Sequence, residues 1–131
     1  MYKALIQQAN KAKEKSYSPY SKFRVGAALL TDDKKIYTGT NIESASYSLT
    51  ICAERVAIFE AVAKGEKNFK AIAITSDMND FITPCGACRQ VLAEFCDEEL
   101  DVIMTNKNLE SKIVKLKELL PYSFKKDFKD K

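Results

Sequence analysis

The 131-residue sequence contains no histidine, and it also lacks strong basic charge and long apolar runs. Without histidine, the commonest metal ligand and general base, any hydrolytic chemistry must use cysteine, carboxylate, lysine or tyrosine side chains. The net charge of +3 is too small for the strongly basic face that nucleic-acid binding usually requires. Residues 1–16 alternate apolar and charged positions, so they predict neither a secretory signal nor a membrane span. These absences favour a cytoplasmic protein that binds a small molecule, with no nucleic-acid or membrane partner.

The length predicts a single domain over residues 1–131, because single domains are most often near this size. The composition is that of an ordinary globular protein, with 46% hydrophobic and 30% charged residues. The last residues, 125–131, are rich in charge and are expected to form a solvated tail.

Hydrophobic periodicity predicts three helices and five strands. The helices are expected at about 2–15, from Cys52 to 64–65, and from Pro84 to about Cys96. The strands are expected at 24–31, 35–40, 70–75, 101–105 and 112–116. Short connections within the first and last strand pairs require antiparallel pairing, whereas strand-helix-strand units favour parallel pairing with helices on both faces. We therefore expect an α/β fold, a three-layer α/β/α sandwich with a mixed five-stranded sheet. Its ligand site should lie where helices begin at the ends of central strands.

Three of the four cysteines stand at expected helix starts. Cys52 opens the second helix, and Cys85 and Cys88 form the PCGAC segment that opens the third. A helix N-terminus presents unpaired N–H groups and a partial positive charge, which stabilise the thiolate form that binds metal. In a reducing compartment, such cysteines indicate metal binding or catalysis rather than disulfides. A CxxC alone is also typical of redox motifs or of half a zinc ribbon, but Cys52 at its own helix start favours a shared metal site.

We expect this site to hold one Zn²⁺ per chain and to keep one coordination position open. A structural zinc site is normally closed by four protein ligands. No histidine is available, and Cys96 lies about two helical turns beyond Cys88, too far to complete the shell. Three thiolates would leave the fourth position open for water, which is typical of catalytic zinc. Cys96 is instead expected to be a buried apolar thiol.

Two charged side chains follow Cys52 in the first turn of the second helix. Glu54 can reach the open side of the metal without being a ligand, so it could shuttle protons. An isolated glutamate in a first turn usually only complements the helix dipole, but the neighbouring thiols favour a catalytic role. Arg55 is one of three arginines in the sequence, and it could offset the negative charge of three thiolates around zinc; a surface arginine is the alternative.

Together these motifs resemble the homotetrameric zinc-dependent cytidine deaminases. The matching segments cover nearly the whole chain: PYSKFRVGAALLT at 19–31, NIE at 41–43, CAER at 52–55, PCGACRQV at 84–91 and ELLPYSF at 118–124. The resemblance implies a cytidine deaminase-like fold, a homotetramer, and hydrolytic deamination of cytidine and deoxycytidine to uridine and deoxyuridine. Ammonia is the second product, and the reaction would belong to pyrimidine salvage.

The resemblance also implies a role for each matching residue. Cys52, Cys85 and Cys88 would hold zinc, while Glu54 would move protons between water, the ring nitrogen and the departing amine, which is the general mechanism of zinc deaminases. The other implied roles are ribose binding by Asn41 and Glu43, binding of the pyrimidine carbonyl by the Ala53 N–H, packing on the base by Phe23, hydrogen bonding to the thiolates by Arg55, and closure of the site by Tyr47 and Phe124 from the same or a neighbouring subunit.

Three other interpretations fit parts of the sequence. A deaminase that edits nucleic acid typically carries HxE where this chain has CAE, and it needs a surface for a polynucleotide. A deaminase for a larger aminopyrimidine nucleoside, such as blasticidin S, conflicts with the NIE, CAER and PYSKF segments. A zinc-binding interaction module without activity would need neither Glu54 nor an open coordination position.

Overall fold

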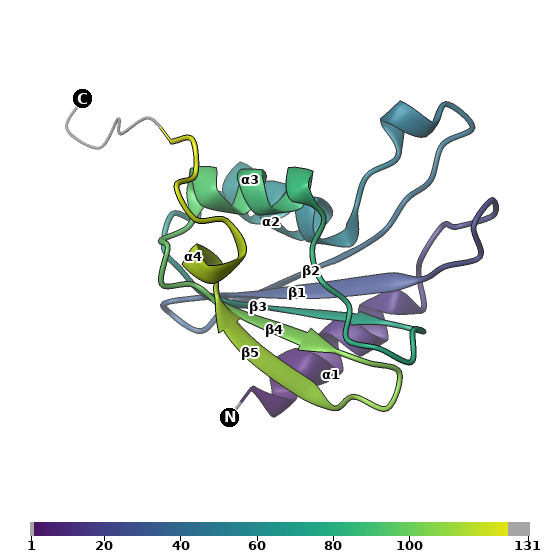
Figure 1. Ribbon diagram of the computed structural model, residues 1–131, viewed down its shortest axis with the longest axis horizontal. Coiled ribbons are helices and arrows are strands. Elements are labelled where there is room, and N and C mark those ends of the chain that lie inside the picture. The colour runs from purple at the N-terminus through teal and green to yellow at the C-terminus, as the bar shows by residue number, and fades with distance from the viewer. Residues whose placement is uncertain (1, 126–131) are drawn as a thin grey trace.

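A computed structural model describes residues 2–125 and shows a sheet with helices packed on both faces (Figure 1). The helices are α1 (Lys3–Lys13), the 3-10 helix η1 (Tyr47–Leu49), α2 (Ala53–Ala63), α3 (Gly86–Phe95) and α4 (Leu116–Leu119). The strands are β1 (Val25–Thr31), β2 (Ile36–Thr40), β3 (Phe69–Ser76), β4 (Asp101–Thr105) and β5 (Ser111–Lys115). The three longer helices and the strands confirm the predicted order, with bounds that differ by a few residues.

The five strands form one mixed sheet in the order β2-β1-β3-β4-β5. The pairs β1–β2 and β4–β5 are antiparallel hairpins, as their short connections require, and β1–β3 is antiparallel as well. Strands β3 and β4 run parallel, with α3 in the crossover between them. This topology confirms the expected α/β fold with a mixed sheet. It also directs the end of β3 toward the start of α3.

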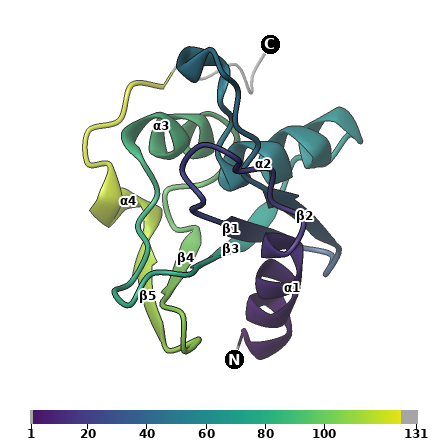
Figure 2. The same cartoon turned by 90° about the vertical axis from the view of Figure 1, so that its right-hand side faces the viewer.

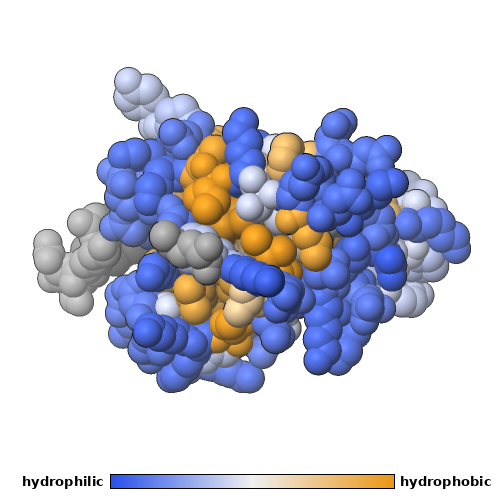
Figure 3. Space-filling model, turned by 90° about the horizontal axis from the view of Figure 1, so that it is seen from below, coloured by the Kyte–Doolittle hydropathy of each residue, from blue (hydrophilic) through white to orange (hydrophobic). Residues whose placement is uncertain are grey.

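The two faces of the sheet carry side chains of different size. In β3, Ile72 and Ile74 face α2 and α3, whereas Ala71 and Ala73 face α1. Figures 1 and 2 show α2 and α3 over one face and α1 alone on the other. Seen from the α1 side, hydrophobic side chains gather near the middle of the surface within a hydrophilic frame (Figure 3). The larger of the two cores therefore supports the helices that carry the cysteines.

Two glycines of the first hairpin allow the helices to approach the sheet closely. A Cβ at Gly26 of β1 would lie 2.0 Å from the Ala9 carbonyl oxygen in α1. A Cβ at Gly39 of β2 would lie 2.4 Å from the Ala53 carbonyl oxygen in α2. The obstructing atoms belong to the backbone of packed helices, so neither position has room for a side chain. Gly39 thereby seats the first turn of α2 against β2.

The sequence pattern does not predict η1 or α4. Helix α4 follows β5 directly: Leu116 is buried, and the Lys115 N–H donates to a carboxylate oxygen of Glu118 at 2.8 Å. These contacts stabilise a single turn that is too short to show a helical period. Of the charged tail expected over 125–131, only Lys125 falls within the described residues. None of the helices in residues 2–125 combines the length and the apolar character that crossing a membrane requires.

Candidate active site

The expected metal-binding cysteines lie where α2 and α3 begin. Cys52 is the N-cap of α2 and Cys85 is the N-cap of α3, and both have extended backbone angles. The Cys88 N–H donates to the Cys85 Sγ at 3.4 Å, so this sulfur caps its own helix. Ala53, the first residue of α2, is fully buried, and its N–H has no acceptor within the helix. Both helices thus present sulfur atoms and unpaired N–H groups at their first turns.

The three expected thiols form one cluster. The Sγ atoms of Cys52 and Cys85 are 3.8 Å apart, and those of Cys85 and Cys88 are 3.3 Å apart. All three lie within 4.8 Å of one another, which suits ligands around a single tetrahedral ion. Cys88 is buried and Cys85 is exposed, so the cluster opens to solvent on one side. Cys96 belongs to the hydrophobic core and not to this cluster.

Hydrogen bonds within the cluster separate the pKa values of its thiols. A hydrogen bond from Cys88, together with those from Arg55 and Cys85, lowers the pKa of Cys52 to about 5. The same bond and burial raise the pKa of Cys88 well above its usual value. The protein groups alone therefore favour a thiolate at Cys52 and a protonated thiol at Cys88, so a site that binds metal through both thiolates requires a compensating dication. A zinc ion fits this donor set, because thiolates are among its preferred ligands.

Glu54 lies in the first turn of α2 and is only 4% exposed. Burial raises the pKa of its carboxyl to about 7, and negative charge at Cys52 acts in the same direction. The charge of Glu54 in turn raises the pKa of Cys88, so the carboxyl lies close enough to interact with the cluster. The result is a buried carboxyl beside a three-thiol site. Such a group can accept and return protons when its partners are within hydrogen-bonding distance.

Arg55 and Arg89 both stand beside cysteines in the sequence, but their guanidinium groups have different partners. Arg55 Nη2 donates to Cys52 Sγ at 3.5 Å, and its buried Nε has no hydrogen-bond partner among residues 2–125. Arg89 donates from Nε to the Pro84 carbonyl at 2.8 Å and from Nη1 to the Leu119 carbonyl at 2.9 Å. Arg89 therefore joins the start of α3 to α4, a role that its position in the sequence does not predict.

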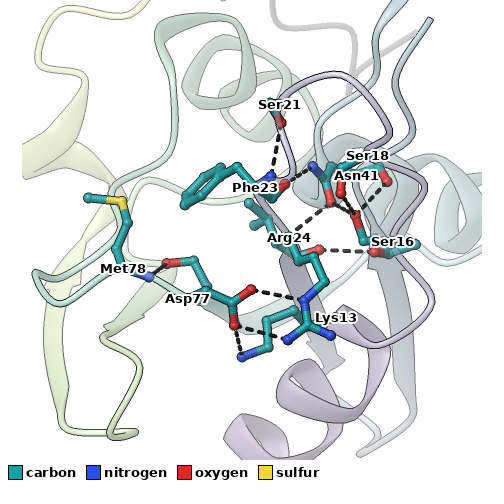
Figure 4. Close-up of polar contacts among 12 residues, drawn as sticks. Lys13, Ser16, Ser18, Ser21, Phe23, Arg24, Asn41, Asp77 and Met78 are labelled. Atoms are coloured by element: carbon teal, nitrogen blue, oxygen red, sulfur yellow. Dashed lines mark hydrogen bonds and ion pairs between the residues drawn. The ribbon is translucent and has the colours of Figure 1, made fainter.

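Asn41 is buried, and its side-chain amide forms hydrogen bonds with neighbouring residues of the same chain (Figure 4). Its Oδ1 accepts from the Val25 N–H at 3.0 Å and from the Ser16 hydroxyl, and its Nδ2 donates to the Phe23 carbonyl at 2.8 Å. These backbone partners fix the orientation of the amide and leave one N–H of Nδ2 for a ligand. Motif reasoning misses Ser16, because its contact with Asn41 joins residues that are far apart in the sequence.

Glu43 faces the loop before β1. Its Oε1 accepts from the N–H groups of Tyr20 and Ser21 at 3.0 and 3.1 Å, and its Oε2 accepts from the Ser21 hydroxyl. The hydrogen bond from the Ser21 side chain lowers the pKa of Glu43 below its usual value. A depression of about 360 Å³ is lined by Glu43 and its neighbours Tyr20, Ser21, Ser44, Tyr47 and Thr50. An ionised acceptor therefore borders a cavity of small-ligand size.

The three aromatic side chains singled out in the sequence differ in burial. Phe23 is half-buried and packs against the core below α2 and α3. Tyr47 is 78% exposed on η1, and its ring lies edge-on to Tyr20 with centroids 6.5 Å apart. Phe124 is 73% exposed, and its carbonyl accepts from Gln90 Nε2 of α3 at 2.6 Å. Among residues 2–125 of one chain, Tyr47 and Phe124 are therefore left mostly uncovered.

Other hollows lie apart from the thiols. A cavity of about 560 Å³ between the end of α3, α4 and the C-terminal segment includes Cys96 in its lining but none of the three clustered cysteines. A groove of about 290 Å³ runs between α1 and the β4–β5 hairpin, on the opposite face of the sheet. Reactive groups, rather than cavity size, therefore identify the candidate active site.

Comparisons with known proteins agree with this geometry. A family model described as the cytidine and deoxycytidylate deaminase zinc-binding region matches residues 1–104. The cytidine deaminase of Sporosarcina psychrophila is 50% identical over 123 residues, which cover 94% of this chain and 90% of that protein. The one from Halalkalibacterium halodurans is 47% identical over 92% of this chain and 91% of its own length. The crystal structure of cytidine deaminase from Burkholderia pseudomallei superposes with a TM-score of 0.92 at 46% identity, covering 95% of this chain and 99% of that one.

The match spans both helix starts that carry the thiol cluster, and the clustered cysteines confirm the expected zinc-binding set. On this sequence and structural evidence, the chain belongs to the cytidine and deoxycytidylate deaminase family of zinc-binding proteins.

Proposed function

We propose that this protein is a zinc-dependent cytidine deaminase that converts cytidine and deoxycytidine, with water, to uridine and deoxyuridine and ammonia. The observation that carries the proposal is the buried carboxyl of Glu54 beside the thiols of Cys52, Cys85 and Cys88. Three protein ligands leave a fourth zinc position for the reaction, and the neighbouring carboxyl supplies the proton transfers that hydrolysis of an amino group needs.

The zinc site and Glu54 would divide the chemistry between them. Cys52, Cys85 and Cys88 would hold zinc, which would supply a Lewis acid that makes water nucleophilic near neutral pH. Glu54 takes a proton from the attacking water and passes it to the ring nitrogen N3. After water oxygen has bonded to C4, Glu54 transfers the second proton to the amino group, and the C4–N bond breaks to release ammonia. Arg55 donates to Cys52 and reduces the negative charge of the thiolates.

Residues from the two loops near β1 would bind the nucleoside. Asn41 has one Nδ2 hydrogen left to donate to a ribose hydroxyl oxygen, and the ionised Glu43 accepts the hydrogen of a hydroxyl group. The Ala53 N–H at the start of α2 binds the pyrimidine carbonyl, and the Phe23 ring packs against the base. These contacts favour a free nucleoside over a polynucleotide, since they enclose the sugar hydroxyls.

We also propose that the protein assembles into a homotetramer, and that Tyr47 and Phe124 close the site from the same or a neighbouring subunit. The support is the number of large apolar side chains that one chain leaves exposed on α2, α3 and the loops beside them. They include Leu49, Phe59 and Phe95 as well as Tyr47 and Phe124. Sedimentation velocity should give a species with four times the 14.8 kDa mass of the chain. A monomer at micromolar concentration would contradict the assembly.

A cytoplasmic location and a single-domain organisation complete the proposal. All four cysteines lie in the described part of the chain and are free, as expected for thiols in a reducing compartment. The two hydrophobic cores share one sheet, which is consistent with one folding unit. Production of uridine within pyrimidine salvage would be consistent with a cytoplasmic, single-domain enzyme.

A panel of substrates tests the proposed activity. Purified zinc-loaded protein is incubated with cytidine, deoxycytidine, cytosine and blasticidin S, and loss of the cytosine absorbance is followed together with ammonia release. Cytidine and deoxycytidine should react well and cytosine poorly. Preferential turnover of blasticidin S, or of cytosine, would contradict the proposed nucleoside contacts, and no turnover of any compound would overturn the enzymatic proposal itself.

A further inference from the structure

Phe23 packs half-buried against the larger core, but the rest of its loop gains little from the hydrophobic cores. None of the residues 14–24, which join α1 to β1, is buried. Lys22 in this loop has a φ of 61°, in the left-handed region. A loop without buried side chains has many accessible conformations, so its position must come from specific polar contacts. The loop must nevertheless be held in place if Phe23 is to meet a pyrimidine.

One group of contacts holds the loop on the side of Asn41 and Glu43. Asn41 bonds to Ser16 and to the Phe23 carbonyl, and Glu43 bonds to Ser21, as described above. The main chains of the two segments also pair: the Tyr17 N–H donates to the Asn41 carbonyl at 3.1 Å, and the Glu43 N–H donates to the Tyr17 carbonyl at 2.8 Å. These contacts extend from Ser16 to Phe23 and hold the loop against the segment that follows β2.

A second group of contacts converges on Asp77, at the end of β3 (Figure 4). The Asp77 Oδ1 accepts from Lys13 Nζ at 2.9 Å, and Lys13 is the last residue of α1. Arg24 binds the same carboxylate through both oxygens, with Nε to Oδ2 at 2.9 Å and Nη2 to Oδ1 at 3.2 Å. Lys13 immediately precedes the loop, and Arg24 is its last residue, next to the start of β1. One carboxylate therefore attaches both ends of the loop to the sheet.

Only the Lys13 part of this network is buried, since the side chains of Asp77 and Arg24 are 39% and 44% exposed. The Lys13 side chain is only 10% exposed, so loss of its partner would leave an almost buried ammonium unpaired. The Arg24 guanidinium binds the Asp77 carboxylate through two hydrogen bonds, which fix the orientation of the two groups as well as the distance between them. Figure 4 shows the Phe23 ring pointing away from this network, so Asp77 acts on the ring through the backbone of Arg24.

We propose that Asp77 is a positioning residue, which joins Lys13 and Arg24 and so holds the Phe23 loop in the conformation that binds the pyrimidine. The proposal rests on the proposed function, because Phe23 contacts a base only if a cytosine nucleoside is the substrate. Asp77 itself does not touch the thiol cluster in this arrangement. Its effect should therefore appear in substrate binding and not in zinc binding or proton transfer.

Asp101→Asn is the matched control for Asp77→Asn. The Asp101 carboxylate also joins a lysine to a second donor: Oδ1 accepts from Lys115 Nζ at 2.6 Å and Oδ2 accepts from the Tyr2 hydroxyl at 2.6 Å. Its side chain is 20% exposed. Asp101 begins β4, whereas Asp77 follows the end of β3, and these two strands are parallel, so the carboxylates lie at opposite ends of the sheet. Both substitutions remove one central charge, but only one of them concerns the Phe23 loop.

Steady-state kinetics of the two variants give the decisive measurement. Asp77→Asn should raise KM for cytidine about tenfold, equivalent to about 1.4 kcal/mol, while kcat falls less than about threefold and zinc content is unchanged. Asp101→Asn should lower the unfolding temperature but leave KM within about twofold of the wild type. Asp77→Glu, which keeps the charge, should restore part of the affinity. Equal KM for the two Asn variants, or a change in kcat alone for Asp77→Asn, would overturn the positioning role.

Limited proteolysis provides a readout that does not depend on turnover. Trypsin should cleave after Lys22 or Arg24 faster in Asp77→Asn than in the wild type, with no such change in Asp101→Asn. If the wild type proved inactive toward cytidine, the proposed function would fail while this measurement still tested the anchoring of the loop. If Asp77→Asn did not fold, Arg24→Gln would replace it, because Arg24 is 44% exposed. Unchanged KM, together with unchanged cleavage after Lys22, in Arg24→Gln would then reject the proposal.

Discussion

The thiol cluster and the loops around Asn41 are held in place in different ways. Cys52, Glu54 and Cys88 lie in the first turns of helices that pack on the larger core, and Glu54 and Cys88 are buried. Residues 14–24 contain no buried side chain and depend on hydrogen bonds and ion pairs. Helices and sheets hold groups more precisely than loops do, and proton transfer requires the greater precision. The difference indicates that catalytic chemistry is placed on the packed region and nucleoside recognition on the loops.

The largest effect is expected at Glu54. Glu54→Gln preserves shape but cannot accept and return a proton, so cytidine turnover should fall by about 10² to 10⁴ or more. Zinc content, fold and binding of a pyrimidine ligand should change little. The measurement is cytidine turnover by the zinc-loaded variant. Circular dichroism and metal analysis serve as controls for fold and zinc content. Activity within about tenfold of the wild type would reject proton transfer by Glu54.

Substitution of single cysteines distinguishes the metal site from the hydrophobic core. Cys85→Ala should lose zinc from about one equivalent per chain to near zero, because it removes one of three ligands. Cys96→Ala should retain zinc and lose stability only, since Cys96 packs in the core. Metal analysis of both purified variants compares the two. Zinc loss in Cys96→Ala, or full retention in Cys85→Ala, would show that the ligand set is different.

Glu43→Gln should affect recognition and leave the chemistry intact. A hydrogen bond to a charged group contributes roughly 1.5–3 kcal/mol, so kcat/KM for cytidine should fall at least about tenfold, mainly through KM. The amide also places an NH₂ group where the carboxylate accepts hydrogen bonds from Tyr20 and Ser21. Free cytosine, which has no sugar, serves as the control substrate. An equal loss for cytosine would mean that Glu43 acts on the reaction and not on the ribose.

The smallest effect is expected in the sheet that both regions share. Thr75 is fully buried, and its hydroxyl has no hydrogen-bond partner among residues 2–125. Thr75→Val keeps the shape and removes the unpaired polar group, so stability should rise by about 1 kcal/mol. Chemical denaturation measures the change, and cytidine kinetics should match the wild type. A loss of stability would show that the hydroxyl does have a partner in solution.

The cysteine cluster could be predicted from the sequence because its determinants are local. The Cys85–Cys88 spacing, the helix starts and the position of Glu54 are all set within a few residues, and the strand order then brings the two helix starts together. The contacts of Asp77 with Lys13 and Arg24, and of Ser16 with Asn41, join positions that are far apart in the chain. No periodicity or short motif encodes such contacts. The 3-10 helix η1 and helix α4 are too short to show a period at all.

Gly26 and Gly39 indicate how mutation would be tolerated in this protein. The two lie one position apart in the β1–β2 pairing, where Gly26 pairs with Thr40 and Ala27 with Gly39, and they face opposite layers. A methyl group at position 39 would displace the turn of α2 that carries Glu54, and one at position 26 would displace α1 from the other side. In a saturation survey scored by cytidine turnover, both positions should be as intolerant as the zinc ligands, although neither glycine has a reactive group. At these two positions, intolerance to substitution would reflect the close packing of the helices on the sheet and not the chemistry of the active site.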